Sequence, residues 1–167
     1  MSFWRKPDPD LPVHARERLA LIVEKYLDHA DEETQRIVTA VAGLLAKVAY
    51  ADGHYSEAEE QTIREALTRV EGLGEQGVDA ICNLLADEIS QVALLGDHDW
   101  TRDLRDLAKR EVRLEVLEVL VELSVADEVL KQEEQVQLRR LAKALNLTQE
   151  AYNAIQSKHR DKLASLS

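Results

Sequence analysis

The stretch Val41-Ala-Gly-Leu-Leu-Ala-Lys-Val-Ala-Tyr-Ala-Asp52 is matched 75 residues later by Val116-Leu-Glu-Val-Leu-Val-Glu-Leu-Ser-Val-Ala-Asp127. Apolar residues recur in both at spacings of three and four, which is the pattern of an amphipathic helix. The offset continues without a gap, so that residues 63–70 align with residues 138–145. Each unit is therefore predicted to be an apolar helix, an acidic turn and a second amphipathic helix. Any two helical hairpins with matched faces look partly alike, but here both turn acids coincide as well, and we expect a structural repeat around a shared core.

The rest of the chain agrees with an all-α fold. Its three prolines are Pro7, Pro9 and Pro12, and the 155 residues after them contain none. Proline is the residue least compatible with a helix interior, and the aromatic content of 4% is low for a sheet protein. We expect seven or eight helices in one bundle of two repeated halves, about 38–71 and 113–146, and no β-sheet. The predicted helices lie near residues 13–29, 33–50, 57–71, 75–92, 98–109, 111–126, 132–145 and 149–160.

The predicted core consists of the apolar residues that repeat at helical spacing. These are Val41, Leu45, Val48, Ile63, Leu67, Leu117, Leu120, Leu123, Leu138 and Leu141. Cys82 lies in an apolar segment and is interpreted as a small core residue rather than a nucleophile. Gly43 is the one glycine within a periodic segment, where it permits the close approach of another helix.

Composition excludes several classes of function. The 32 acidic residues outnumber the 21 lysines and arginines, and the resulting net charge of -11 argues against nucleic acid as a partner. A single cysteine allows no intrachain disulfide. The longest uncharged stretch, residues 37–46, is half the length of about 20 residues that a membrane-spanning helix needs. With no apolar leader at its N-terminus, the chain is expected to be cytoplasmic and to have no transmembrane segment.

The first acidic turn has two interpretations. Asp52 can close an Asx turn before Gly53, and Ser56 with Glu59 fits a capping box that opens the next helix. Alternatively, a helix-turn-helix brings Asp52 back toward Glu59, and converging carboxylates form an oxygen site for Ca²⁺, Mg²⁺ or Mn²⁺. The alternating acids of an EF-hand loop are missing, and His54 is more simply a solvated side chain.

The second acidic turn keeps the spacing of the first, with Asp127 and Glu134 in place of Asp52 and Glu59. Lys131 replaces the capping serine, so the capping box is lost while the acids remain. This persistence favours a role for the acids beyond capping. We therefore predict a weakly bound divalent cation at each turn, the second weaker than the first.

The two turns resemble those of the tellurite-resistance TerB family, which includes the TerB-like domain of a membrane-anchored DnaJ-type co-chaperone. The resemblance covers about residues 35–156 and includes Trp100-Thr-Arg-Asp-Leu, the helix that follows it, and Val125-Ala-Asp-Glu. It implies an all-helical fold and a non-enzymatic, cytoplasmic module of the stress response, linked to resistance to tellurite and other toxic agents. It also implies divalent metal binding through Asp52, Glu59, Asp127 and Glu134, and association with partner proteins in membrane-linked complexes. Glu128 stands where the family pattern has glycine.

The domain organisation follows from this match. Residues 1–30 are expected to form an N-terminal arm and a first helix outside the family domain, which would span residues 31–160. Asp97-His-Asp99 is interpreted as an N-terminal cap of the helix that follows rather than as a metal triplet.

Three functions remain open from the sequence. The chain can be a cation-binding interaction module, a purely structural interaction domain whose acids only cap helices, or a metal-dependent hydrolase. The last ranks lowest because no general base or oxyanion donor appears outside the turns.

Overall fold

The computed structural model describes residues 12–126 and 132–165, with side chains for residues 15–126 and 132–160. Within these residues the chain forms eight helices and no strand, which confirms the all-α prediction. The helices are α1 (Pro12–Tyr26), α2 (Glu32–Ala49), α3 (Glu57–Thr68), α4 (Gly74–Leu94), α5 (His98–Leu107), α6 (Arg110–Val125), α7 (Gln132–Ala144) and α8 (Gln149–Ser165).

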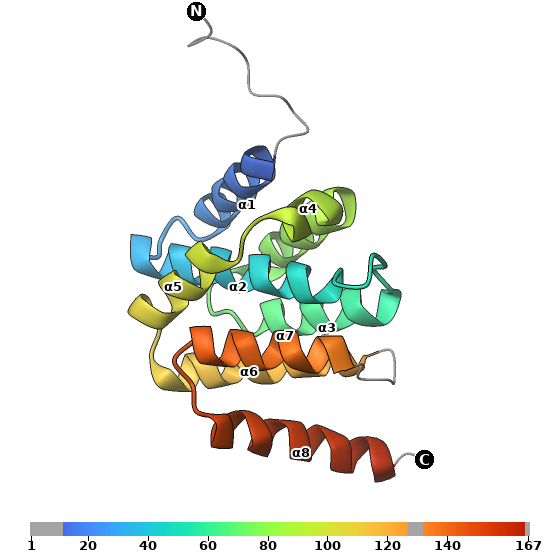
Figure 1. The fold of residues 1–167 in the computed structure, drawn as a ribbon. Helices are drawn as coiled ribbons and strands as arrows, with labels where there is room; N and C mark the ends of the chain where they lie inside the picture. The colour runs from blue at the N-terminus through green and yellow to red at the C-terminus, as the bar shows by residue number, and fades with distance from the viewer. Residues whose placement is uncertain (1–11, 127–131, 166–167) are drawn as a thin grey trace, which may run out of the picture.

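The bounds of the helices follow the 75-residue offset of the sequence. Helices α3 and α7 begin at Glu57 and Gln132, and helices α4 and α8 begin at Gly74 and Gln149. The offset therefore relates three consecutive helices, α2–α4, to α6–α8, one more than the hairpin that the sequence predicted. Helices α6, α7 and α8 lie together in the lower half of Figure 1, and α1 and α4 lie together above them.

The core is built around α2, which packs against α1, α3, α4, α5 and α6. Its small residues Ala40, Ala42, Gly43, Ala46 and Ala49 are all buried, which allows neighbouring helices to approach from several sides. The predicted core is buried at Leu45, Val48, Ile63, Leu67, Leu117, Leu120, Leu123, Leu138 and Leu141. Val41 is only partly buried, because it lines an apolar groove of about 150 Å³ between α2, α3 and α6.

Helix α1 belongs to the same core as the helices that follow it. Its residues Ala15, Leu19 and Val23 are fully buried, and it packs mainly on α4 and α2. Arg18 forms an ion pair with Glu88, the residue at which α4 is kinked. Helix α1 is therefore packed into the bundle along most of its length.

The α4 C-terminus is held by a charged side chain from the centre of the bundle. The Lys47 ammonium donates hydrogen bonds to the carbonyl oxygens of Ala93 and Leu95, at 3.2 and 2.7 Å. A cation at this end also interacts favourably with the negative end of the helix dipole. None of the described helices is both long enough and apolar enough to cross a membrane.

The prediction for Asp97 and Asp99 as caps requires a correction. Asp97 occupies the N-cap position of α5, but its side chain makes no capping hydrogen bond. It accepts a 2.7 Å hydrogen bond from Arg140 of α7 instead, and Asp99 accepts one from Arg16 of α1. Both carboxylates therefore bind arginine side chains of other helices, and the side chain of Asp97 does not cap α5.

Candidate functional site

The first acidic turn is closed by local hydrogen bonds. Asp52 Oδ1 accepts a 3.0 Å hydrogen bond from the His54 amide, which is an Asx turn, and Gly53 takes a φ of +83° that suits a residue without Cβ. His54 is exposed, as expected. The predicted turn chemistry is therefore present, and Asp52 holds the loop between α2 and α3.

Helix α3 opens with the predicted capping box. Ser56 Oγ accepts a 3.1 Å hydrogen bond from the Glu59 amide, and Glu59 Oε1 accepts a 3.0 Å hydrogen bond from the Ser56 amide. Glu59 is only 5% exposed. Its carboxylate satisfies a helix N-terminus, which is the capping interpretation of the sequence.

A negative environment surrounds the start of α3. Tyr55 is half-buried beside this turn, and burial raises the pKa of its hydroxyl far above the ordinary value, with the nearby thiol of Cys82 and the charges of Glu60 and Glu59 adding to the effect. Cys82 itself is fully buried, and burial raises the pKa of its thiol. This confirms Cys82 as a core residue, since a reactive cysteine needs a stabilised thiolate.

Asp52 faces the other repeat. It lines a cavity of about 160 Å³ together with Ala51 and with Glu133, Glu134 and Gln137 of α7. Figure 1 shows the α2–α3 turn and the N-terminal end of α7 at the same end of the molecule. The carboxylates that share this cavity therefore come from two different repeats.

Of the predicted site residues that the structure describes, only Asp52 and Glu134 lie at the same cavity. Asp52 and Glu134 line the same cavity, whereas Glu59 is not among the residues that line it and serves as the capping residue of α3. Asp127 lies outside the described residues. Among the residues that are described, no group of three or more His, Cys, Asp or Glu side chains has the arrangement of a metal site.

Sequence reasoning missed Glu133 and the pairing between repeats. The offset showed which residues are equivalent, but not which repeat supplies the neighbours of each turn. The one sequence feature that could have pointed to Glu133 is its position in the first turn of α7, next to Glu134.

The architecture defines a class: an all-α protein with duplicated helices and an acidic turn between the first two helices of the first repeat. The profile of the family described as "Tellurite resistance protein TerB" matches residues 38–157. The chain belongs to this family. No curated protein and no solved structure matches it.

Proposed function

We propose that this TerB-family protein is a non-enzymatic module of a stress response that binds a divalent cation weakly between its acidic turns. The observation that supports the proposal is the cavity that Asp52 shares with Glu133 and Glu134. Association with partner proteins, and a link to resistance to tellurite and other toxic agents, are proposed from the family alone.

The chemistry of the cavity favours a hard cation. Carboxylates brought together repel one another, and a divalent ion between them relieves that repulsion. The Asx turn uses Asp52 Oδ1 once, and an ionised carboxylate accepts several further contacts. With few protein ligands, water would complete the coordination shell, so the expected dissociation constant is about 10⁻⁴–10⁻³ M.

The site proposed from the structure differs in pairing from the one that the sequence suggested. Asp52 would share its ion with one acid of the other repeat, Glu134, and Glu133 would add negative charge from the wall of the same cavity. By the 75-residue offset, Asp127 would be the counterpart of Asp52, and Glu59 the counterpart of Glu134. A cation between repeats would link the two halves of the bundle.

A purely structural function is the alternative, and specific hydrogen bonds favour it. The capping box of Ser56 and Glu59 and the Asx turn of Asp52 give these two acids a structural role without an ion. In this case the domain acts through its surface alone, and added cations leave its stability unchanged.

Thermal unfolding with and without Ca²⁺, Mg²⁺ or Mn²⁺ distinguishes the two functions. A cation at about 100 times its dissociation constant stabilises the folded state by about 2.7 kcal/mol, which raises the melting temperature. We expect this rise in the wild type and its loss in Asp52→Asn combined with Glu134→Gln.

The matched control is Glu150→Gln, which removes one charge from the exposed first turn of α8. It should keep the full rise. Melting curves that no cation shifts would contradict metal binding and favour the structural alternative. A rise that persists in the double variant would place the ion elsewhere.

A further inference from the structure

The apolar groove between α2, α3 and α6 is lined almost entirely by aliphatic side chains. Only two charged residues reach it, Arg69 from the end of α3 and Glu115 from α6, and both are exposed. Its volume of about 150 Å³ accommodates one group the size of a benzene ring. Because its α3 wall, Ala66 to Val70, lies at the C-terminal end of that helix, the groove is separate from the cavity at the acidic turn.

The duplication gives this groove a counterpart in the other half of the molecule. Helix α5 packs against α2 and α7. By the 75-residue offset, these two helices correspond to α6 and α3, which form two walls of the apolar groove. A helix therefore covers this place on one repeat, whereas on the other repeat no described helix does, since α6 packs against α2, α3, α7 and α8.

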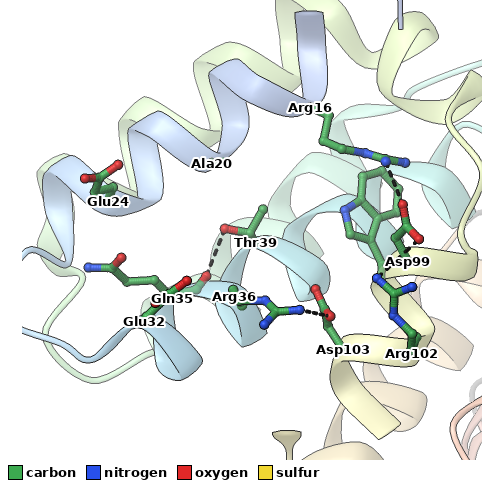
Figure 2. Close-up of a pocket in the computed structure, with 11 residues that line it drawn as sticks. Arg16, Ala20, Glu24, Glu32, Gln35, Arg36, Thr39, Asp99, Arg102 and Asp103 are labelled. Atoms are coloured by element: carbon green, nitrogen blue, oxygen red, sulfur yellow. Dashed lines mark hydrogen bonds and ion pairs between the residues drawn. The ribbon is translucent and has the colours of Figure 1, made fainter. Parts of the chain in front are cut away.

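The contact of α5 with α2 combines an aromatic side chain with charges. The ring of Trp100 lies against Gly43, and Arg36 forms an ion pair with Asp103, as Figure 2 shows. Lys47 holds the carbonyl end of α4, directly before α5. This face of α2 therefore binds a helix that presents an apolar anchor and a carboxylate to a surface with two cations.

The corresponding face of α6 carries the opposite charge. The counterparts of Arg36, Ala40, Gly43 and Lys47 are four acids, Glu111, Glu115, Glu118 and Glu122. Lys158 of α8 pairs with Glu118, whereas Glu111 and Glu115 are exposed and form no ion pair with a described residue. Because Glu115 also lines the groove, the apolar surface and this acidic face are continuous.

We propose that the apolar groove binds a basic amphipathic helix of a partner protein, in the place that α5 takes on the other repeat. One aromatic or branched aliphatic side chain enters the groove and supplies most of the affinity. Lysine or arginine side chains one turn away face Glu111 and Glu115 and fix the orientation of the helix, while Arg69 on the opposite wall favours an acid on that side. The net charge of -11 attracts a basic partner and opposes a second copy of the chain.

Fluorescence polarisation with a designed peptide tests this surface in the full-length protein. The peptide is a labelled amphipathic sequence of about 18 residues, long enough to form a helix, with one phenylalanine on its apolar face and lysines one turn to either side. The comparison peptide has glutamates in place of the lysines. At low salt we expect the lysine peptide to bind at least about tenfold more tightly than the glutamate peptide. In 1 M salt, where the Debye length is about 3 Å, this preference should largely disappear.

Two matched pairs of variants locate the bound peptide. Glu115→Lys should weaken binding of the lysine peptide about tenfold, whereas Glu24→Lys, the same charge change at an exposed residue of α1, should change it by less than about twofold. Ala66→Phe fills the groove and should also weaken binding, and Ala58→Phe, at an exposed residue of the same helix, should not. Circular dichroism checks that each variant folds, and the pair of charge variants remains informative if Ala66→Phe does not fold.

Three results would overturn the proposal. The first is a lysine peptide that does not bind or binds no better than the glutamate peptide. The second is an equal loss in Glu115→Lys and Glu24→Lys, which would show that the peptide follows net charge alone. The third is a wild-type dimer in analytical ultracentrifugation that becomes monomeric in Ala66→Phe, which would assign the groove to a second copy of the chain.

Discussion

Trp100 lies directly against the backbone of α2, and Gly43 makes this contact possible. A Cβ atom added at Gly43 would lie 2.5 Å from Cε2 of the Trp100 ring, and Trp100 is buried. We predict that Gly43→Ala lowers the free energy of unfolding by about 1–3 kcal/mol, because the indole or α5 must shift. Urea unfolding measures this, with Gly96→Ala as the control, since a Cβ at Gly96 meets nothing within 4 Å. Equal stability of Gly43→Ala and wild type would show that α5 moves without cost.

Single residues were predictable from the sequence where their partners are close along the chain. The Asx turn of Asp52 and the capping box of Ser56 and Glu59 involve residues two and three positions apart, and both are present. Gly43 was recognisable as a point of close approach, but its partner Trp100 lies 57 residues further on. The cavity that Asp52 shares with Glu133 likewise depends on how the repeats pack, which local spacing does not specify.

At the scale of elements, Asp97 and Arg140 connect the start of α5 to α7. Burial opposes ionisation of Asp97, but the hydrogen bond and charge of Arg140, with Lys47 nearby, hold its pKa below the ordinary value of 3.8. We predict that Asp97→Asn lowers the free energy of unfolding at pH 7 by about 1 kcal/mol.

The sign of the pH dependence follows from the lowered pKa. The unfolded state takes up a proton on Asp97 before the folded state does, so the contribution is complete above the unfolded pKa and is lost as the pH falls through the folded pKa. The difference between wild type and Asp97→Asn in urea unfolding should therefore be constant from pH 7 to 5 and shrink below about pH 4. Asp87→Asn, which removes an exposed aspartate on α4, is the control. A difference that grows toward low pH would contradict this assignment.

Helical periodicity predicted every element that the structure describes, because the absence of proline after residue 12 left no competing signal. The ends were less predictable. Helix α1 was expected to reach residue 29 and ends at Tyr26, and α8 continues to Ser165 beyond the expected residue 160. The kink of α4 lies at Glu88, which forms an ion pair with Arg18 of α1. Because that partner comes from another helix, the sequence around Glu88 alone does not predict the kink.

At the scale of the whole molecule, the duplication accounts for six of the eight described helices but not for α1. Shifted by 75 residues, the range of α1 falls on residues 87–101, which span the end of α4, a loop and the start of α5. Helix α1 covers α4, whereas the corresponding helix α8 presents exposed polar residues such as Asn153, Ser157 and Arg160. Helix α8 can therefore leave this face exposed to solvent. The corresponding face of α4 is covered by α1.

This asymmetry predicts that α1 unfolds together with the family-matched helices, although the match begins at residue 38. Leu19 is fully buried, so Leu19→Ala should lower the free energy of unfolding by about 2–5 kcal/mol. Leu21→Ala changes a residue of the same helix that is 63% exposed, and it should leave stability within about 0.5 kcal/mol of wild type. In a Trp4→Phe background, Trp100 fluorescence and far-ultraviolet circular dichroism should report one urea transition that Leu19→Ala shifts for both probes. If α1 were instead a separate appendage, Leu19→Ala would remove a small part of the dichroism signal and leave the Trp100 transition in place.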